Sequence, residues 1–393
     1  MYLRPDVFAR RLWEYSIVRS GAIVSTVPAS IIFKLSLPRR QYATQADKMP
    51  PKEKPQPSVP RPSSSVILIS PENQVLLLHR VRTSSSFPSA HVFPGGNLAP
   101  LHDGEVPGPD DPARHADSEA YRIAAIRETF EESGILLAKN NGFGRLIEVN
   151  DAEREEGRRL VHSNKIEFRK WLASKGGRAD IDNLIPFTRW VTPTNIPKRF
   201  TTQMYIYLLP LSHDKVDPLH SGGSTDSSEG GSEVVIPDPT PDGGKEHTAA
   251  RFLPPSKWLE LAQSGRIIMF PPQFFLLHLI SPFLSPEGAG KAVASYSDRQ
   301  AQRKAMLEFV RGGNPPWAEQ VISPIALPPS HGGKRADGRV ALALDKPGPE
   351  LMGLRKGEPD HCVLVEFKKE GPRKLEVRTR KSVLEEGRAE SKM

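Results

Sequence analysis

Two short apolar runs, residues 66–69 and 75–78, set the first clear pattern in the chain. Both are rich in Val, Ile and Leu, and a Pro-Glu-Asn turn separates them, so the pattern predicts a β-hairpin. A further short strand is expected at residues 91–93, where a Pro-Gly-Gly sequence ends it. Residues 97–117 are polar, with Gly and Pro throughout, and this composition predicts a loop.

From Ser118 onward the spacing of apolar residues becomes helical. Three of them recur at i, i+3 and i+7, on one helix face: Ile123, Ile126 and Phe130. Asp117 or Ser118 can cap the start of this helix, and Gly134 can end it in the left-handed conformation. Helices are also expected at 149–175, as a pair, 257–263 and 273–279, and strands at 190–192, 204–209, 249–253, 363–367 and 374–378, the last two forming a late hairpin.

Composition limits how much of the chain can pack into one core. Of 393 residues only 37% are hydrophobic, whereas 30 are Gly and 39 are Pro. We therefore expect one folded domain at residues 65–289, flanked by poorly packed ends. A Pro-rich linker is expected at 49–64 and a disordered, low-complexity insertion at about 219–245. Residues 290–393 are expected to form a loose extension that contains the late hairpin.

The same composition excludes several classes of protein. A single cysteine, Cys362, excludes a disulfide scaffold and a multi-cysteine zinc site, and it suits an intracellular compartment. No run of 18 apolar residues exists, so no membrane span is expected. The net charge of +8 suits an anionic substrate, nucleic acid or an organellar address, and does not choose among them.

Both ends of the chain have features of targeting signals. Residues 1–48 are rich in Arg, Ser and apolar residues and poor in acidic ones, which is typical of a mitochondrial transit peptide. The alternatives are a basic disordered tail or a start site placed too far upstream, with Met49 as a second start. The final tripeptide, Ser391-Lys392-Met393, resembles the peroxisomal signal whose best-known form is S-K-L. We therefore expect the peroxisome, the mitochondrion or both as the location, and import receptors as partners.

The most informative segment lies at the end of the first predicted helix. Glu128, Glu131 and Glu132 stand at i, i+3 and i+4, which places three carboxylates on one helix face, about 5–6 Å apart. Like charges at this spacing repel each other, so the trio costs stability unless a cation lies among them. Carboxylate oxygens suit a hard divalent cation, Mg²⁺ or Mn²⁺. The alternative is a charged helix face that is simply exposed to water.

This segment resembles the Nudix box, G-x5-E-x7-R-E-U-x-E-E-x-G-U, where U is a bulky aliphatic residue. Glu119 lies eight residues before Arg127, as the box requires, and Gly134 follows the last glutamate at the required spacing. Thr129 departs from the box, which has an aliphatic residue at that position. The resemblance implies an α/β fold, with a mixed β-sheet between helices, and assigns residues 65–289 to a Nudix hydrolase domain.

The glycine of the box identifies a narrower resemblance. It best matches Gly96, and residues 97–118 then separate it from Glu119, where the box has five residues. A long insertion at this place resembles the peroxisomal coenzyme A and acyl-coenzyme A diphosphatases of the Nudix superfamily. Three sequence features are shared with them: HVF-x-GG at 91–96, W-x-TP at 190–193 and RF at 199–200.

The resemblance implies metal-dependent hydrolysis of a diphosphate. Mg²⁺ or Mn²⁺ would be held by the three glutamates and by the carbonyl of Gly96, and would lower the pKa of a bound water. Glu119 is expected just outside the metal ligands. Arg127 is expected to orient a glutamate, the alternative being an ion pair at the surface. Glu246 is the candidate general base, or else a charge at the end of a loop, and His247 beside it is expected to be exposed to solvent.

Basic residues could bind the phosphates of such a substrate, because guanidinium groups suit bidentate contacts with phosphate. The candidates are Arg80, Arg82, Lys198 and Arg199. Ordinary surface charge is the alternative for each of them. Arg80 also fits an upstream motif of other coenzyme A-cleaving relatives, but Ser85 and Ser89 depart from that motif, which has Arg and Gly there.

The leading interpretation is therefore hydrolysis of coenzyme A or acyl-coenzyme A to 3′,5′-ADP and (acyl-)4′-phosphopantetheine. The expected partner is a small-molecule diphosphate, and no nucleic-acid partner is expected. One rival is a Nudix pyrophosphatase acting on NADH, nucleotide sugars or capped RNA. Another is a non-catalytic Nudix module used for binding, although such a module has no need of three mutually repelling glutamates.

Overall fold

A computed structural model describes residues 56–83, 88–140, 145–211, 240, 247–285, 294–327 and 335–390. The chain divides into two units, residues 1–54 and Pro55–Met393, and the described residues all belong to the second. Several expectations therefore fall outside the described residues. They are the transit peptide, the first part of the Pro-rich linker (49–55), the low-complexity insertion apart from Thr240, the base Glu246 and the tripeptide 391–393.

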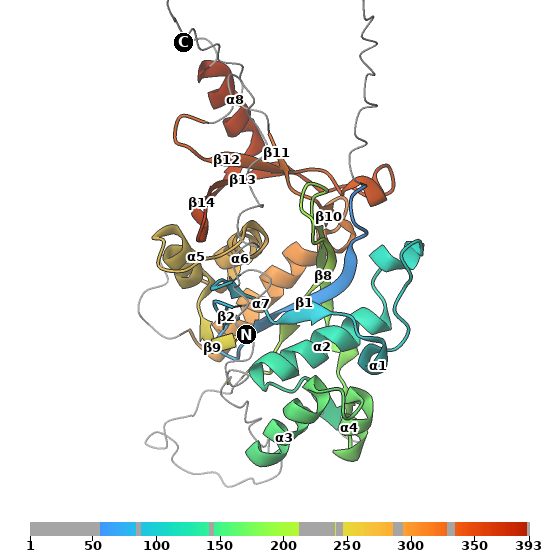
Figure 1. Cartoon of the computed structure of the whole chain (residues 1–393). Helices are drawn as coiled ribbons and strands as arrows, with labels where there is room; N and C mark the ends of the chain where they lie inside the picture. Colours follow the sequence, from blue (N-terminus) through green and yellow to red (C-terminus); the bar gives the residue numbers. More distant parts are fainter. Residues whose placement is uncertain are drawn as a thin grey trace, which may run out of the picture. The chain divides into compact units, whose positions relative to one another are not determined.

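The main sheet has the strand order β10-β7-β8-β1-β2-β3, with β4 paired to β1 and β9 paired to β2. Figure 1 labels five of these strands, β10, β8, β1, β2 and β9. The strands are β1 (Arg61–Ile69), β2 (Val75–Arg80), β3 (His91–Val92), β4 (Gly95–Asn97), β7 (Ile185–Val191), β8 (Phe200–Leu208), β9 (His247–Leu253) and β10 (Val321–Ile322). Strands β1 and β8 run parallel, whereas β1 and β2 are antiparallel. This mixed sheet confirms the predicted fold class and the predicted first hairpin.

The folded region begins earlier than predicted. Strand β1 starts at Arg61, inside the segment assigned to a linker, and not at residue 65. Two neighbours hold this early part in place: the Arg61 amide donates to the carbonyl of Arg199 over 2.9 Å, and β4 pairs with residues 63–65. Strand partners on both sides therefore outweigh the low strand propensity of the Pro-Ser-rich sequence.

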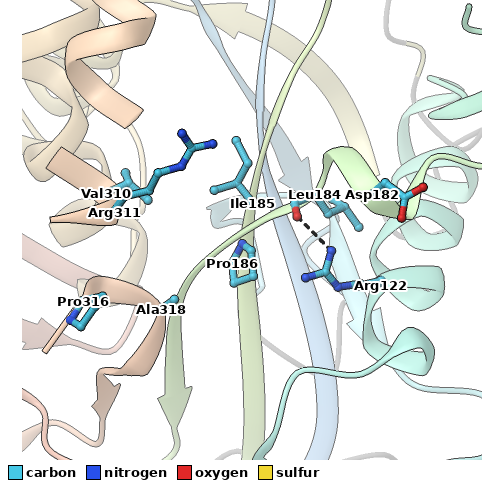
Figure 2. Close-up of a pocket in the computed structure, with 9 residues that line it drawn as sticks. All are labelled: Arg122, Asp182, Leu184, Ile185, Pro186, Val310, Arg311, Pro316 and Ala318. Carbon is cyan, nitrogen blue, oxygen red and sulfur yellow. Dashed lines mark hydrogen bonds between the residues drawn. The ribbon is translucent and has the colours of Figure 1, made fainter. Parts of the chain in front are cut away.

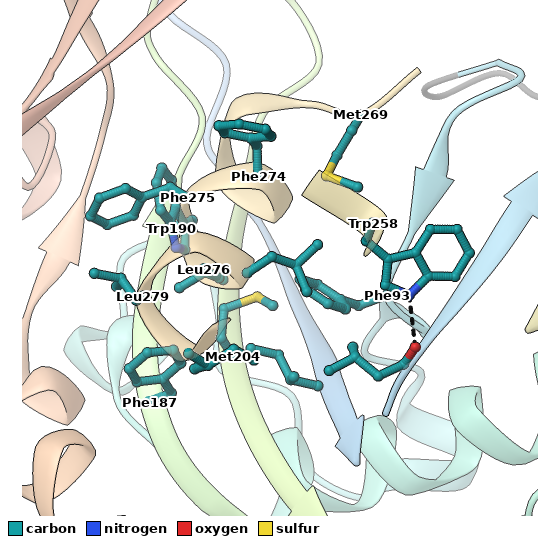
Figure 3. Close-up of a cluster of buried hydrophobic side chains, with 14 of the residues drawn as sticks. Phe93, Phe187, Trp190, Met204, Trp258, Met269, Phe274, Phe275, Leu276 and Leu279 are labelled. Atoms are coloured by element: carbon teal, nitrogen blue, oxygen red, sulfur yellow. Dashed lines mark hydrogen bonds between the residues drawn. The ribbon is translucent and has the colours of Figure 1, made fainter. Parts of the chain in front are cut away.

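Different helices cover the two faces of the main sheet. Side chains alternate along β1, so Val66 and Leu68 belong to one core cluster and Ile67 and Ile69 to another. The first cluster contains residues of α2 (Glu119–Ser133), α3 (Asp151–His162) and α4 (Phe168–Ser174). The second contains residues of α5 (Pro255–Gln263), α6 (Pro271–Leu284) and α7 (Tyr296–Arg311). Figure 3 shows this second cluster, where the Trp258 indole N–H donates to the Val75 carbonyl over 2.8 Å.

The segment predicted as a loop before α2 is partly helical. It contains α1 (Pro100–Asp103) and the 3₁₀ turn η1 (Pro112–His115). Helix α2 ends as predicted, because Gly134 takes a φ of 76° and its N–H donates to the Phe130 carbonyl. The predicted side-chain cap at its start is absent: Ser118 makes no such bond, and Asp117 instead pairs with Arg122.

The C-terminal region contains more regular structure than its composition suggests. Strands β11 (Ile325–Ala326), β12 (Val340–Leu344), β13 (Glu358–Lys368) and β14 (Gly371–Thr379) form a second sheet, followed by α8 (Arg380–Glu390). The late hairpin is confirmed as β13 and β14. Leu344, Val363 and Leu375 belong to the same core cluster as Ile67. The described residues beyond 290 are therefore packed into the folded unit and do not form a loose extension.

The remaining elements are short. They are the paired strands β5 (Ala138–Asn140) and β6 (Gly177–Ala179), and the 3₁₀ turns η2 (Ile181–Asn183), η3 (Trp317–Glu319) and η4 (Pro349–Leu351). None of the helices in the described part of the chain has the length and apolar content that crossing a bilayer requires.

Candidate functional site

Helix α2 presents the predicted glutamates from its C-terminal half. Its opposite side is buried, with Phe130 stacked on Trp171 at a ring-centroid distance of 4.7 Å. Thr129, which departs from the Nudix pattern, is fully buried, and its hydroxyl donates to the Ala125 carbonyl over 2.8 Å. The threonine is therefore accommodated without leaving a buried polar group unsatisfied.

Arg127 lies at the centre of the site. Its Nη1 donates to Oε1 of Glu128 over 2.9 Å and to Oε1 of Glu131 over 2.8 Å. Its side chain is only 5% exposed, so these ion pairs are buried and not at the surface. Burial alone would lower the pKa of Arg127, but Glu128, Asp103 and Glu131 together raise it well above its ordinary value.

Glu128 lies against the glycine pair of β4. A Cβ added at Gly96 would come within 2.4 Å of the Glu128 carboxyl carbon, so the side chain occupies space that only glycine leaves open. Burial raises the pKa of Glu128 to about 7, partly offset by the guanidinium of Arg127.

Glu132 contacts the other glycine of the pair. The Gly95 amide donates to Oε2 of Glu132 over 2.8 Å, and His247 Nε2 lies 3.7 Å from its Oε1. His247 is fully buried at the start of β9, so the expectation that it is exposed to solvent is wrong. Local sequence carries no signal for this burial, because it arises in the folded protein, where β9 pairs with β2 and His247 is the register partner of Arg80.

Helix α3 supports the third glutamate. His162 Nδ1 lies 3.1 Å from Oε2 of Glu131, and Arg158 donates to the Glu131 backbone carbonyl over 2.9 Å. Glu119 lies in the first turn of α2, nine residues before Glu128, which corresponds to about 13 Å along a helix. Its side chain is 59% exposed and pairs with Arg169, so the structure does not bring Glu119 to the other glutamates.

The donor groups at this site fit a divalent cation. Within the described residues, no group of three or more acidic, His or Cys side chains converges as a ready-made metal site. The chemistry is nevertheless suitable, because Glu128 and Glu132 contact the Gly95–Gly96 pair and carboxylate oxygens are the ligands that Mg²⁺ and Mn²⁺ prefer. Because Gly96 has no Cβ, the strand backbone can also lie close to the Glu128 carboxylate.

The four predicted phosphate-binding residues lie in different surroundings. Arg80, at the end of β2, is half-buried and is the register partner of His247, whose Nε2 lies 3.7 Å from Glu132 Oε1. Arg82 is exposed just beyond that strand end. Lys198 is exposed, with its ammonium 5.9 Å from the centre of the Phe200 ring.

Arg199 differs from the other three because it is buried. Only 2% of the residue is exposed, and its guanidinium pairs with Glu350 at 2.5 Å and donates to the carbonyls of Thr192 and Ser58. These contacts tie β8 to the segment before β1 and to η4. A guanidinium held in this way has a structural role, and we do not retain Arg199 as a phosphate-binding residue.

A separate cavity of about 410 Å³ lies away from the glutamates (Figure 2). Arg122, Asp182, Pro186 and Arg311 are among its lining residues. Arg122 is held there by Asp117 and by the carbonyl of Leu184, to which it donates over 3.1 Å. No predicted site residue lines this cavity.

Comparisons with known proteins show which proteins this chain resembles. Residues 109–218 match the family model described as the NUDT19 Nudix domain. A putative nudix hydrolase 7 of Caenorhabditis elegans is 31% identical over 150 residues, which cover 38% of this chain and 44% of that protein. These matches, together with the glutamates of α2, confirm the resemblance to Nudix hydrolases.

The particular resemblance is to proteins named NUDT19. The acyl-coenzyme A diphosphatase NUDT19 of Xenopus laevis is 29% identical over 253 residues, covering 53% of this chain and 60% of that protein. The alignments thus span between 44% and 60% of the length of these two relatives. A crystal structure of a NUDIX hydrolase from Alicyclobacillus acidocaldarius matches 60% of this chain and 97% of its own, at 21% identity and a TM-score of 0.43.

Proposed function

We propose that this chain hydrolyses the diphosphate bond of coenzyme A or acyl-coenzyme A, giving 3′,5′-ADP and (acyl-)4′-phosphopantetheine. The main support is one buried network of ion pairs beside the glycine pair of β4, in which Arg127 donates to Glu128 and Glu131. Similarity to an acyl-coenzyme A diphosphatase supports the choice of substrate.

The chain's own residues would hold the metal and fix its surroundings. Glu128, Glu131, Glu132 and the carbonyl of Gly96 are the proposed ligands for Mg²⁺ or Mn²⁺. When bound, the metal would neutralise the diphosphate oxygens and lower the pKa of the attacking water. Arg127 would keep two of the carboxylates oriented, and the Gly95 amide would keep Glu132 against β4.

The substrate would extend from the glutamates toward the end of β2. Arg80 and Arg82 are the proposed contacts for the 3′-phosphate, and the pairing of Arg80 with His247, which approaches Glu132, supports this choice. Lys198 is a more distant candidate. Glu246 remains the proposed general base, and its position directly before His247 in the sequence supports this choice.

A panel of diphosphates tests the proposal. The purified chain is incubated with Mg²⁺ or Mn²⁺ and with coenzyme A, an acyl-coenzyme A, NADH, a nucleotide sugar or capped RNA, and the products are resolved by mass. We expect 3′,5′-ADP and 4′-phosphopantetheine from the first two substrates at the highest rates. Faster cleavage of NADH or another diphosphate would favour the rival enzyme, and no cleavage of any of them would favour the non-catalytic module.

A further inference from the structure

The insertion before α2 contributes a buried acidic residue to the site. Asp103 ends α1, and its side chain is fully buried. Its Oδ1 accepts from Arg127 Nε over 2.9 Å, and its Oδ2 accepts from Arg127 Nη2 over 2.9 Å and from the Ala99 amide over 2.7 Å. Both carboxylate oxygens are therefore engaged, and Arg127 is gripped in the bidentate geometry that guanidinium and carboxylate groups favour.

The bidentate pair with Asp103 fixes the orientation of the whole Arg127 guanidinium. Arginine has five N–H donors in a rigid plane. Two are taken by Asp103, a third by the Asn97 carbonyl at 3.0 Å, and the remaining pair on Nη1 by Glu128 and Glu131. Because the group is planar, fixing its Nε–Nη2 edge on Asp103 fixes where Nη1 meets the two glutamates.

We propose that Asp103 is a positioning residue for the carboxylate site, acting through Arg127 on Glu128 and Glu131. The inference rests on the metal-binding part of the proposed function. It assigns the insertion a role in the site, whereas the sequence pattern predicted only a longer loop.

Charge supports the same conclusion. Asp103 balances Arg127, so with all groups ionised the three glutamates keep their full negative charge for a divalent cation. Without the Asp103 charge, the single positive charge of the guanidinium would offset one of the three glutamate charges, and the site would attract a cation less strongly. Loss of orientation and loss of charge therefore act in the same direction.

Asp103 is itself held by elements outside α2. Arg169 of α4 donates to the Asp103 carbonyl over 3.3 Å. The neighbouring His102 contacts Asn164 Oδ1 over 2.7 Å and accepts from the Phe168 amide over 3.2 Å. The insertion thus links the α3–α4 region to the glutamates, so α1 is a rigid support for the Asp103 carboxylate.

The test compares metal binding by the full chain and by Asp103→Asn, which preserves shape and removes the charge. Mn²⁺ alone is titrated, with free Mn²⁺ followed by electron paramagnetic resonance, so no substrate is needed. We expect the Kd for Mn²⁺ to rise by about 10–100-fold, the range found when groups that support metal ligands are removed. Asp110→Asn is the matched control, because Asp110 is an exposed aspartate in the same insertion, and its Kd should equal that of the unaltered chain.

The outcomes separate this inference from the proposed function. An unaltered Kd in a folded Asp103→Asn variant, or no Mn²⁺ binding by the unaltered chain, overturns the inference. If the unaltered chain binds Mn²⁺ and Asp103→Asn weakens binding, but no diphosphate is cleaved, the inference stands and the proposed function fails. If a thermal melt shows that Asp103→Asn is not folded, Asp103→Glu is used instead. It keeps the charge but shifts the bidentate edge, so weaker binding than in the unaltered chain is expected, and equal binding again overturns the inference.

Discussion

At the scale of single residues, the glutamates of α2 carry the clearest expectation. Glu131→Gln or Glu132→Gln keeps size and helix propensity but removes one charged oxygen donor. Turnover of coenzyme A should therefore fall by at least roughly two orders of magnitude while the fold survives. This is the loss that typically follows when one electrostatic group is removed from an active site. Steady-state kinetics with a circular-dichroism melt would measure both.

Glu156→Gln is the control for these variants, since Glu156 is an exposed glutamate on α3 that pairs only with Arg159 at the surface among the contacts described. It should retain normal turnover. Near-normal turnover in both Glu131→Gln and Glu132→Gln would contradict the assignment of the site.

The basic residues at the end of β2 give a second expectation at this scale. If Arg80 or Arg82 contacts the 3′-phosphate, dephospho-coenzyme A should be the poorer substrate, because one charge-assisted hydrogen bond is lost. The loss should be roughly 1.5–3 kcal/mol in kcat/KM. Arg82→Met should then reduce the difference between the two substrates, whereas equal rates for both with the unaltered chain would rule out such a contact.

The sequence identifies some residues of the site and leaves others unrecognised. The spacing of Glu128, Glu131 and Glu132 identifies the site, because helix geometry alone brings i, i+3 and i+4 together. Asp103 and His247 could not be predicted in the same way. Each reaches the glutamates through tertiary contacts, Asp103 through a short helix with no repeating pattern and His247 through the pairing of β9 with β2.

At the scale of elements, β4 and α2 meet at a glycine pair whose members have different roles. A Cβ at Gly95 would come within 2.3 Å of the Ser64 backbone carbonyl oxygen, so Gly95→Ala should destabilise the β1–β4 pairing by about 1–3 kcal/mol. A Cβ at Gly96 would meet only the movable end of Glu128. Gly96→Ala should therefore lower turnover, by roughly 100-fold for a displacement of about 1 Å, with little loss of stability.

Thermal unfolding and kinetics on the two glycine variants provide the comparison, each serving as the control for the other. A large loss of stability in Gly96→Ala, or normal turnover in it, would contradict the close approach of Glu128 to the strand.

Long, strongly patterned elements were the ones that the sequence predicted well. The buried part of β1 follows from its continuous apolar run at 66–69, and helix α2 follows from apolar residues that repeat along one helix face. The start of β1, helix α1, strands β11 and β12 and the packing of the C-terminal sheet into the core were missed. Their stability comes from neighbours distant in sequence, such as β8 beside Arg61 and the core cluster around Leu344, and local composition does not record such neighbours.

At the scale of the whole molecule, the two candidate targeting signals are expected to compete. An N-terminal signal leaves the ribosome first, so a chain that begins at Met1 should enter mainly mitochondria. A chain begun at Met49 lacks the basic segment and should depend on Ser391-Lys392-Met393 alone. The earliest hydrogen bonds among the described residues involve Ser58, so both forms keep every contact described for the site.

Imaging tests this expectation with a tag placed inside residues 219–245, so that both ends stay free. Deleting the final tripeptide should abolish the peroxisomal signal of the short form and leave the mitochondrial signal of the long form. A short form that reaches peroxisomes without its tripeptide would disprove the C-terminal signal. A long form that never enters mitochondria would disprove the N-terminal one.

The core shared by the two sheets has a consequence for how the protein loses activity when it is destabilised. Because Leu344 and Ile67 belong to one continuous cluster, the described unit should melt in a single cooperative transition. Leu344→Ala should lower the free energy of unfolding by about 2–5 kcal/mol. Leu344 lies on β12 of the second sheet, whereas Glu128 and Glu132 contact β4 of the main sheet. Each folded molecule should therefore keep its kcat and KM, and only the number of folded molecules should fall. Calorimetry and active-site titration would detect this, and harmful substitutions in the second sheet would then lower the amount of enzyme in a cell without altering its kinetics.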